Sequence, residues 1–76
     1  MNRLKDLRED KDLFQRDVAN FLNIKQQQYS RYELLQNDVP TSILIELSLF
    51  YNTSIDYLLG LTDINKPYPR SKFYKK

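Results

Sequence analysis

The stretch from residue 15 to residue 33, QRDVANFLNIKQQQYSRYE, most constrains how this chain can fold. Its apolar residues recur three or four positions apart on either side of Asn23, which predicts two short helices, at about 14–22 and 26–33. Asn tolerates the left-handed backbone that a tight turn requires. Ala19 provides a small side chain where the second of these helices can approach the first closely. The stretch therefore predicts two helices packed across a sharp turn.

The predicted helix at 26–33 has two chemically different faces. At 3.6 residues per turn, four polar side chains fall within an arc of about 140°: Gln26, Gln27, Ser30 and Arg31. Tyr29 and Tyr32 point the opposite way and are expected in the core. A glutamine can pair with an adenine edge, and an arginine can pair with guanine through two hydrogen bonds. The polar face suits base recognition, although a solvated surface is the plain alternative for one helix by itself.

Composition limits the chain to one small, mostly helical domain. Its 76 residues allow a single core, 41% of them are hydrophobic, and only one is Gly. The chain has no Cys and no His, which removes disulfides, thiol and imidazole catalysis, and the commonest metal ligands. We therefore expect no cofactor and no metal. No secretory signal or membrane-spanning run is present in the sequence, so no membrane association is expected and a cytoplasmic location is the default.

Charge is distributed unevenly along the chain. Residues 1–60 hold seven basic and nine acidic side chains, a net charge of −2, whereas residues 61–76 hold five basic and one acidic, a net charge of +4. The whole-chain charge of +2 is too small to argue for nucleic-acid binding. We predict a folded domain over 1–60 and a basic, flexible tail over 61–76. The tail is either a solvated end or an arm that contacts DNA or a partner.

Two further helices are predicted after Pro40, at about 41–51 and 55–59. The first of them is apolar on nearly every side, and Ile45 and Leu49 lie away from its main apolar stripe. A domain this small cannot easily bury every side of a helix. These two residues are therefore a candidate self-association surface, and coverage by the last helix is the alternative.

The remaining helix ends carry recognisable signals. Asn2 can cap a first helix, Ser54 can cap the last one, and Gly60 can end it. The charged side chains between residues 3 and 11 are expected to form a solvated face of the first helix.

These features resemble the helix-turn-helix domain of the Cro/C1-type repressor family. Five residues stand where that family has its Gln, its Ala, its Gly or Asn, and two apolar residues: Gln15, Ala19, Asn23, Tyr29 and Tyr32. The resemblance covers about residues 3–60. It implies an all-α fold, a five-helix bundle of the phage-repressor DNA-binding type, followed by the tail.

The resemblance also implies which residues contact double-stranded DNA. The helix at 26–33 would enter the major groove, with base contacts from Gln26, Gln27, Ser30 and Arg31. Phosphate contacts would come from Gln15, Arg16 and Lys25. A homodimer would form at least on DNA and would read two half-sites about one helical turn apart.

Three positions depart from the family pattern. Phe14 stands at the N-cap of the 14–22 helix, where Thr or Ser is usual, which costs about 1 kcal/mol unless Asp12 takes over. Lys25 stands where Ser or Thr usually caps the next helix, and it can reach a phosphate instead. Leu35 replaces a Gly that normally supplies a left-handed helix end. The helix at 26–33 should therefore continue by a turn or end under strain.

The leading interpretation is a sequence-specific DNA-binding transcriptional regulator, bacterial or phage in type and most simply a repressor. The alternative is a protein-interaction module on the same fold, antitoxin-like or antirepressor-like, which would use an apolar surface such as Leu34 and Leu35. An enzyme is poorly supported because the sequence shows no nucleophile–base pair, metal cluster or Gly-rich phosphate loop. No small-molecule substrate is evident.

Overall fold

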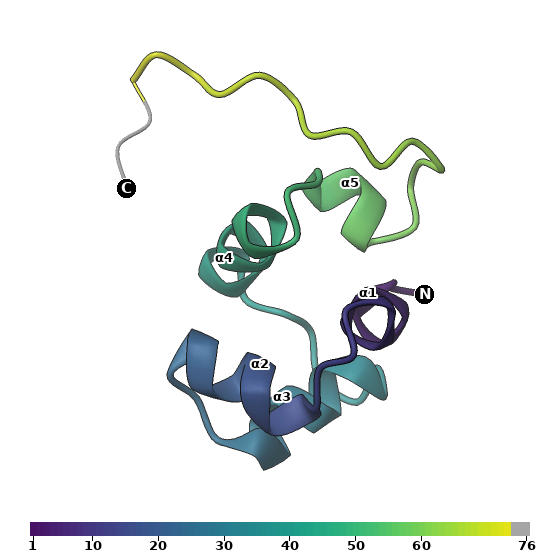
Figure 1. The fold of residues 1–76 in the computed structure, drawn as a ribbon, viewed down its shortest axis with the longest axis vertical. Coiled ribbons are helices and arrows are strands. Elements are labelled where there is room, and N and C mark those ends of the chain that lie inside the picture. Colours follow the sequence, from purple (N-terminus) through teal and green to yellow (C-terminus); the bar gives the residue numbers. More distant parts are fainter. Residues whose placement is uncertain (74–76) are drawn as a thin grey trace.

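The computed structural model describes residues 1–73, which form five helices and no strand (Figure 1). The helices are α1 Leu4–Asp10, α2 Gln15–Leu22, α3 Gln26–Glu33, α4 Thr41–Phe50 and α5 Ile55–Leu58. The predicted ranges 14–22, 41–51 and 55–59 each exceed the observed helix by one residue. Helices α2 and α3 lie at one end of the molecule, and α5 with the following segment lies at the other (Figure 1). The all-α, five-helix prediction is confirmed, while residues 74–76 of the predicted tail lie outside the described residues.

The core is built from side chains of all five helices and of the turn after α4. Nine apolar or aromatic residues are buried: Leu4, Val18, Ala19, Leu22, Tyr29, Tyr32, Leu47, Tyr51 and Leu58. Tyr29 and Tyr32 lie inside, as their spacing predicts, and Ala19 is buried on α2, whose closest neighbour is α3. Among the described residues, no helix is both long enough and apolar enough to cross a bilayer.

The five helices of residues 1–73 all end in the same way. Each helix is followed, within two positions, by a residue with a left-handed backbone and a φ from 52° to 77°: Asp12, Asn23, Leu35, Asn52 and Gly60. The amide of this left-handed residue donates to the carbonyl three positions before it. The amide of the following residue donates to the carbonyl five positions before itself. This pattern satisfies carbonyls that a helix end otherwise leaves unpaired. The predicted roles of Asn23 and Gly60 as helix ends are confirmed.

Leu35 is the costly member of this set. Asn and Asp tolerate the left-handed region through local hydrogen bonds, whereas Leu bears a penalty of roughly 1–2 kcal/mol there. Its φ is 61°, and the Gln36 amide beyond it donates to the Arg31 carbonyl at 2.9 Å. Of the two expectations, the structure selects the strained end, since α3 stops at Glu33.

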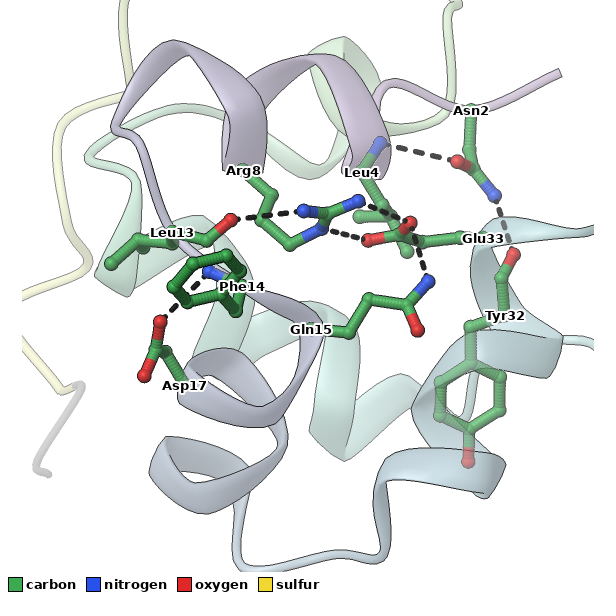
Figure 2. A network of polar contacts seen from close by, with 9 residues as sticks. All are labelled: Asn2, Leu4, Arg8, Leu13, Phe14, Gln15, Asp17, Tyr32 and Glu33. Atoms are coloured by element: carbon green, nitrogen blue, oxygen red, sulfur yellow. Dashed lines mark hydrogen bonds and ion pairs between the residues drawn. The ribbon is translucent and has the colours of Figure 1, made fainter.

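The start of α2 shows that Asp12 does not take over the cap that Phe14 lacks. Phe14 occupies the N-cap position and has no side-chain oxygen to offer. Asp17 compensates in part, because its carboxylate accepts the Phe14 amide at 2.8 Å (Figure 2). Asp12 lies in the left-handed end of α1 instead. The sequence signal for this cap was therefore the carboxylate three residues after Phe14.

The caps of α1 and α5 lie close to their predicted places. The Asn2 side chain accepts the Leu4 amide at 3.1 Å, although Arg3 occupies the N-cap position of α1. Asn2 also donates to the carbonyl of Tyr32, which ties the start of the chain to α3 (Figure 2). At α5, Ser54 Oγ accepts the amide of residue 57 at 3.0 Å, as predicted for a helix cap.

Candidate nucleic-acid interface

A buried ion pair joins α1 to the last residue of α3 (Figure 2). The Arg8 guanidinium donates from Nε and Nη2 to the two oxygens of Glu33, at 2.7 and 3.1 Å. The two side chains are only 11% and 3% exposed. Arg8 also donates to the Leu13 carbonyl at 2.9 Å, so the same guanidinium holds the loop before α2. The expectation that the whole charged run from residue 3 to residue 11 is solvated is wrong for Arg8 and also for Arg3, whose side chain is only 13% exposed.

Gln15 is the third member of this network. Its Nε2 donates to Glu33 Oε1 at 3.1 Å, which fixes the start of α2 against the end of α3 (Figure 2). The side-chain amide that could reach a phosphate therefore already has a partner inside the protein. A phosphate contact at Gln15 stays a prediction, and its backbone N–H is the group that suits it. That N–H lies in the first turn of α2, where a helix has no acceptor for it.

Burial and charge act in opposite directions on Glu33. Burial by itself would raise the pKa of Glu33, but the hydrogen bonds from Arg8 and Gln15 and the Arg8 charge lower it, and the net shift is downward. The hydrogen bond to Glu33 likewise raises the pKa of Arg8. Both groups are therefore charged at neutral pH. A charged, bidentate pair has a fixed orientation, so it sets how α3 sits against α1.

The outer face of α3 has the polar character that the sequence predicts. Gln26, Gln27 and Arg31 are exposed, and Ser30 is half-buried. On the inner side, Tyr29 and Tyr32 are 0% and 3% exposed. The helix therefore presents amide and guanidinium groups outward from a fully packed aromatic base.

Gln28 is a residue of this region that the sequence analysis left out. It is exposed, and its Nε2 donates to the Tyr32 hydroxyl at 2.9 Å. The two residues are four positions apart, a spacing that brings side chains on one helix together. That spacing was the available signal. The contact fixes the Gln28 amide at the edge of the polar face.

Two predicted phosphate contacts have exposed side chains. Lys25 is exposed at the N-cap position of α3 and makes no side-chain cap, as its chemistry requires. Arg16 is exposed on α2, and its guanidinium carbon lies 4.6 Å from the centroid of the Phe14 ring. Phe14 itself is 61% exposed. A guanidinium at this distance from an aromatic ring is attracted to it, so Phe14 favours one position of Arg16.

The candidate apolar surfaces lie at two other places. Leu34 and Leu35, directly after α3, are 62% and 59% exposed. Ile45 and Leu49 on α4 are half-buried and line a groove of about 400 Å³ that also involves α5 and residues beyond it. Self-association through Ile45 and Leu49 stays a prediction.

Comparison with known proteins identifies the family of this chain. A helix-turn-helix family model matches residues 4–58. The HTH-type transcriptional regulator ImmR of Bacillus subtilis (strain 168) is 41% identical over 64 residues, which cover 84% of this chain and 50% of that protein. The uncharacterized HTH-type transcriptional regulator YobD of the same strain is 34% identical over 74 residues, which cover 97% of this chain and 66% of that protein.

The chain thus spans between about half and about two-thirds of the length of these curated relatives. No solved structure gives a significant match. The family model covers every helix from α1 to α5, and its range agrees with the region in which the sequence resembles Cro/C1-type repressors. This chain belongs to the helix-turn-helix family.

Proposed function

We propose that this chain is a sequence-specific DNA-binding transcriptional regulator, that it acts as a repressor, and that α3 reads the major groove. The observation that carries the proposal is the division of α3 into a buried aromatic side and an exposed amide and guanidinium side. A helix of eight residues is about 12 Å long. The major groove admits a helix of this kind, and its base edges pair with Gln and Arg. The names of the two relatives support the same class of function.

In this proposal Gln26, Gln27 and Arg31 contact base edges, and the half-buried Ser30 lies behind them in the same groove. Lys25, Arg16 and the backbone N–H of residue 15 contact phosphates and set the register of α3. The buried ion pair behind α3 makes no contact with DNA. Its role is to hold α1, α2 and α3 in one arrangement, so that base and phosphate contacts form together.

A second copy completes the proposed site. One domain of this size buries little surface on DNA, so a single copy should bind weakly. Two copies related by a two-fold axis would place their α3 helices about 34–36 Å apart and read a palindromic site. Ile45 and Leu49 are the proposed contact between them.

A protein-interaction module on the same fold is the second candidate. The exposed pair Leu34 and Leu35 favours it, because two adjacent leucines at about 60% exposure are unusual on a surface that meets only DNA. On this alternative an antitoxin-like or antirepressor-like partner covers the leucines, and the polar face of α3 has no role in binding.

Selection from a pool of random duplex DNA, repeated at low and high salt, tests the proposal. We expect enrichment of a roughly palindromic site. Gln27→Ala and Arg31→Ala should each weaken binding to that site by about 1–3 kcal/mol and relax its sequence at one position. Lys25→Ala should weaken binding to all sequences alike and lower the salt dependence by about one counterion.

The control is Lys66→Ala, which removes one cation from the segment at the opposite end of the molecule from α3 (Figure 1). It should leave the selected sequence unchanged. Enrichment that survives the Gln27 and Arg31 substitutions would refute major-groove reading by α3. Absence of any binding at low salt would refute DNA binding and favour the module that uses Leu34 and Leu35.

A further inference from the structure

The segment after Gly60 turns back across α5 and α4 (Figure 1). Two side-chain hydrogen bonds attach it to the helices. Thr53 Oγ1 donates to the Asn65 carbonyl at 2.7 Å, and the Tyr68 hydroxyl donates to Asp56 Oδ2 at 2.9 Å. We call residues 64–71 the strap. Its two anchors lie on the helix side at the turn before α5 and within α5.

A groove of about 400 Å³ lies between the strap and the helices. The helices contribute apolar side chains to it from α4 and α5, namely Ile45, Leu49 and Ile55. The strap contributes Pro67 and Tyr68 on the opposite wall. The two residues proposed for self-association therefore face the strap.

The hydroxyl groups that line the groove already have partners. Ser48 donates to the Ile45 carbonyl at 2.7 Å, and Ser54 accepts an amide as the cap of α5. The Thr53 hydroxyl donates to the strap, at the Asn65 carbonyl. Since a polar ligand would find these groups occupied, the groove suits apolar side chains.

The strap covers this apolar face without filling the groove. Its large apolar side chains remain mostly exposed, since Ile64 and Tyr68 are 67% and 66% exposed. The Tyr68–Asp56 hydrogen bond is itself exposed, so water competes for both groups. The two polar anchors hold the strap through contacts that can exchange with water, and opening the strap removes little apolar contact.

We infer that the strap competes with a second copy of this chain for the face of α4 that carries Ile45 and Leu49. The inference rests on the dimer in the proposed function and adds its regulation: the closed strap keeps copies apart, and the open strap lets them pair. A two-fold pairing places an apolar face against the same face of the partner. Among the described residues that line the helix side of the groove, Asp56 is the single charged one, so apart from it the face that would meet the partner is uncharged.

Sedimentation equilibrium of the full chain tests the competition. Tyr68→Phe removes only the hydroxyl that Asp56 accepts, and Thr53→Val removes the other anchor while keeping the shape of the side chain. Each variant should self-associate several-fold more tightly than the unmodified chain, and the double variant more tightly again. The matched control is Ser71→Ala, because the Ser71 hydroxyl accepts a local amide, that of Phe73, and makes no hydrogen bond to the helices among residues 1–73. This control should behave as the unmodified chain.

A third substitution locates the contact. Ile45→Glu in the Tyr68→Phe background should restore the monomer, since it places a charge on the apolar face. Unchanged or weaker association of Tyr68→Phe would overturn the inference, and so would a monomer in every variant. If circular dichroism shows that Thr53→Val is unfolded, the exposed Tyr68→Phe decides alone.

Binding to a duplex with one half-site separates this inference from the proposed function. Tyr68→Phe should leave that binding unchanged, because α3 lies at the other end of the molecule (Figure 1). If no variant binds DNA while Tyr68→Phe still associates more tightly, the strap inference stands and the proposed function fails. If DNA binds and association is unchanged, the proposed function stands and the strap inference fails.

Discussion

Two ion pairs of equal length occur in different surroundings at the two ends of α1. Arg8 meets Glu33 at 2.7 Å between α1 and α3, with side chains 11% and 3% exposed. Arg3 meets Asp63 at 2.7 Å beside α5, where the Arg3 side chain is 13% exposed but the Asp63 side chain is 100% exposed. A buried pair is costly to break, because either partner left alone remains desolvated, whereas water replaces an exposed partner easily. The α1–α3 end is therefore held in one geometry, and the end that carries the strap can open.

This difference matches the two proposed tasks. Base reading needs side chains in fixed positions, and the pair behind α3 provides a rigid base for Gln27 and Arg31. Competition between the strap and a second copy needs contacts that exchange. The exposed Tyr68–Asp56 and Arg3–Asp63 contacts are of this kind.

Breaking the buried pair should have the largest effect. Arg8→Ala leaves the Glu33 carboxylate without its charged partner, so we expect the free energy of unfolding to fall by about 3–5 kcal/mol. Urea denaturation followed by circular dichroism measures it. Replacing both residues, as Arg8→Met with Glu33→Leu, should cost less than Arg8→Ala alone. A double variant as unstable as Arg8→Ala would show that the charges contribute to stability beyond avoiding an unpaired partner.

Acid should weaken the same end of the molecule. Because the pKa of Glu33 is lower in the folded chain, the unfolded chain takes up its proton first. The stability that Glu33 contributes is present above its unfolded pKa, near the usual 4.5, and is lost as pH falls through the lower folded value. Urea denaturation from pH 6 to pH 3 should show this loss. Glu33→Gln should flatten the slope, and an equal slope in the variant would assign it to other carboxylates.

Substitutions at two helix ends should change the free energy of unfolding by an intermediate amount. Leu35→Gly should raise the free energy of unfolding by about 1 kcal/mol, because Gly adopts a φ of 61° without strain. The reciprocal change, Gly60→Ala, should destabilise the other end: φ is 77° there, and an added Cβ would lie 2.7 Å from Met1 Sδ. Thermal unfolding of the two variants measures both changes in stability. A loss of stability in Leu35→Gly would mean that the Leu35 side chain contributes more packing than its strain costs.

The smallest effect is expected at the exposed pair. Asp63→Ala should leave the free energy of unfolding within experimental error, since the Asp63 side chain is fully exposed. Arg3 keeps its other contacts there, a hydrogen bond to the Tyr57 carbonyl at 3.1 Å and a stacking contact with the Tyr57 ring. Urea denaturation of Asp63→Ala and Arg8→Ala under the same conditions compares the two pairs. A loss of stability in Asp63→Ala similar to that in Arg8→Ala would contradict the prediction.

Local sequence patterns were sufficient for the helices and their faces. Spacing of three and four residues placed Tyr29 and Tyr32 inside and Gln26, Gln27 and Arg31 outside, because a helix brings such neighbours onto one face. Turn chemistry at Asn23 likewise predicted the left-handed link between α2 and α3, since the conformation depends on that residue alone.

Tertiary structure decided what local spacing cannot express. Arg8 and Glu33 are 25 positions apart, and charge along the first helix predicted solvent for Arg8 where the fold supplies a buried carboxylate. The Gln15 amide is held by the same carboxylate. The strap forms because Thr53 and Asp56 meet residues 12 positions farther along a segment without helix or strand. The sequence by itself determined which residues form helices and which faces are polar. Contacts between distant segments depend on the three-dimensional arrangement of helices, and only the fold reveals that arrangement.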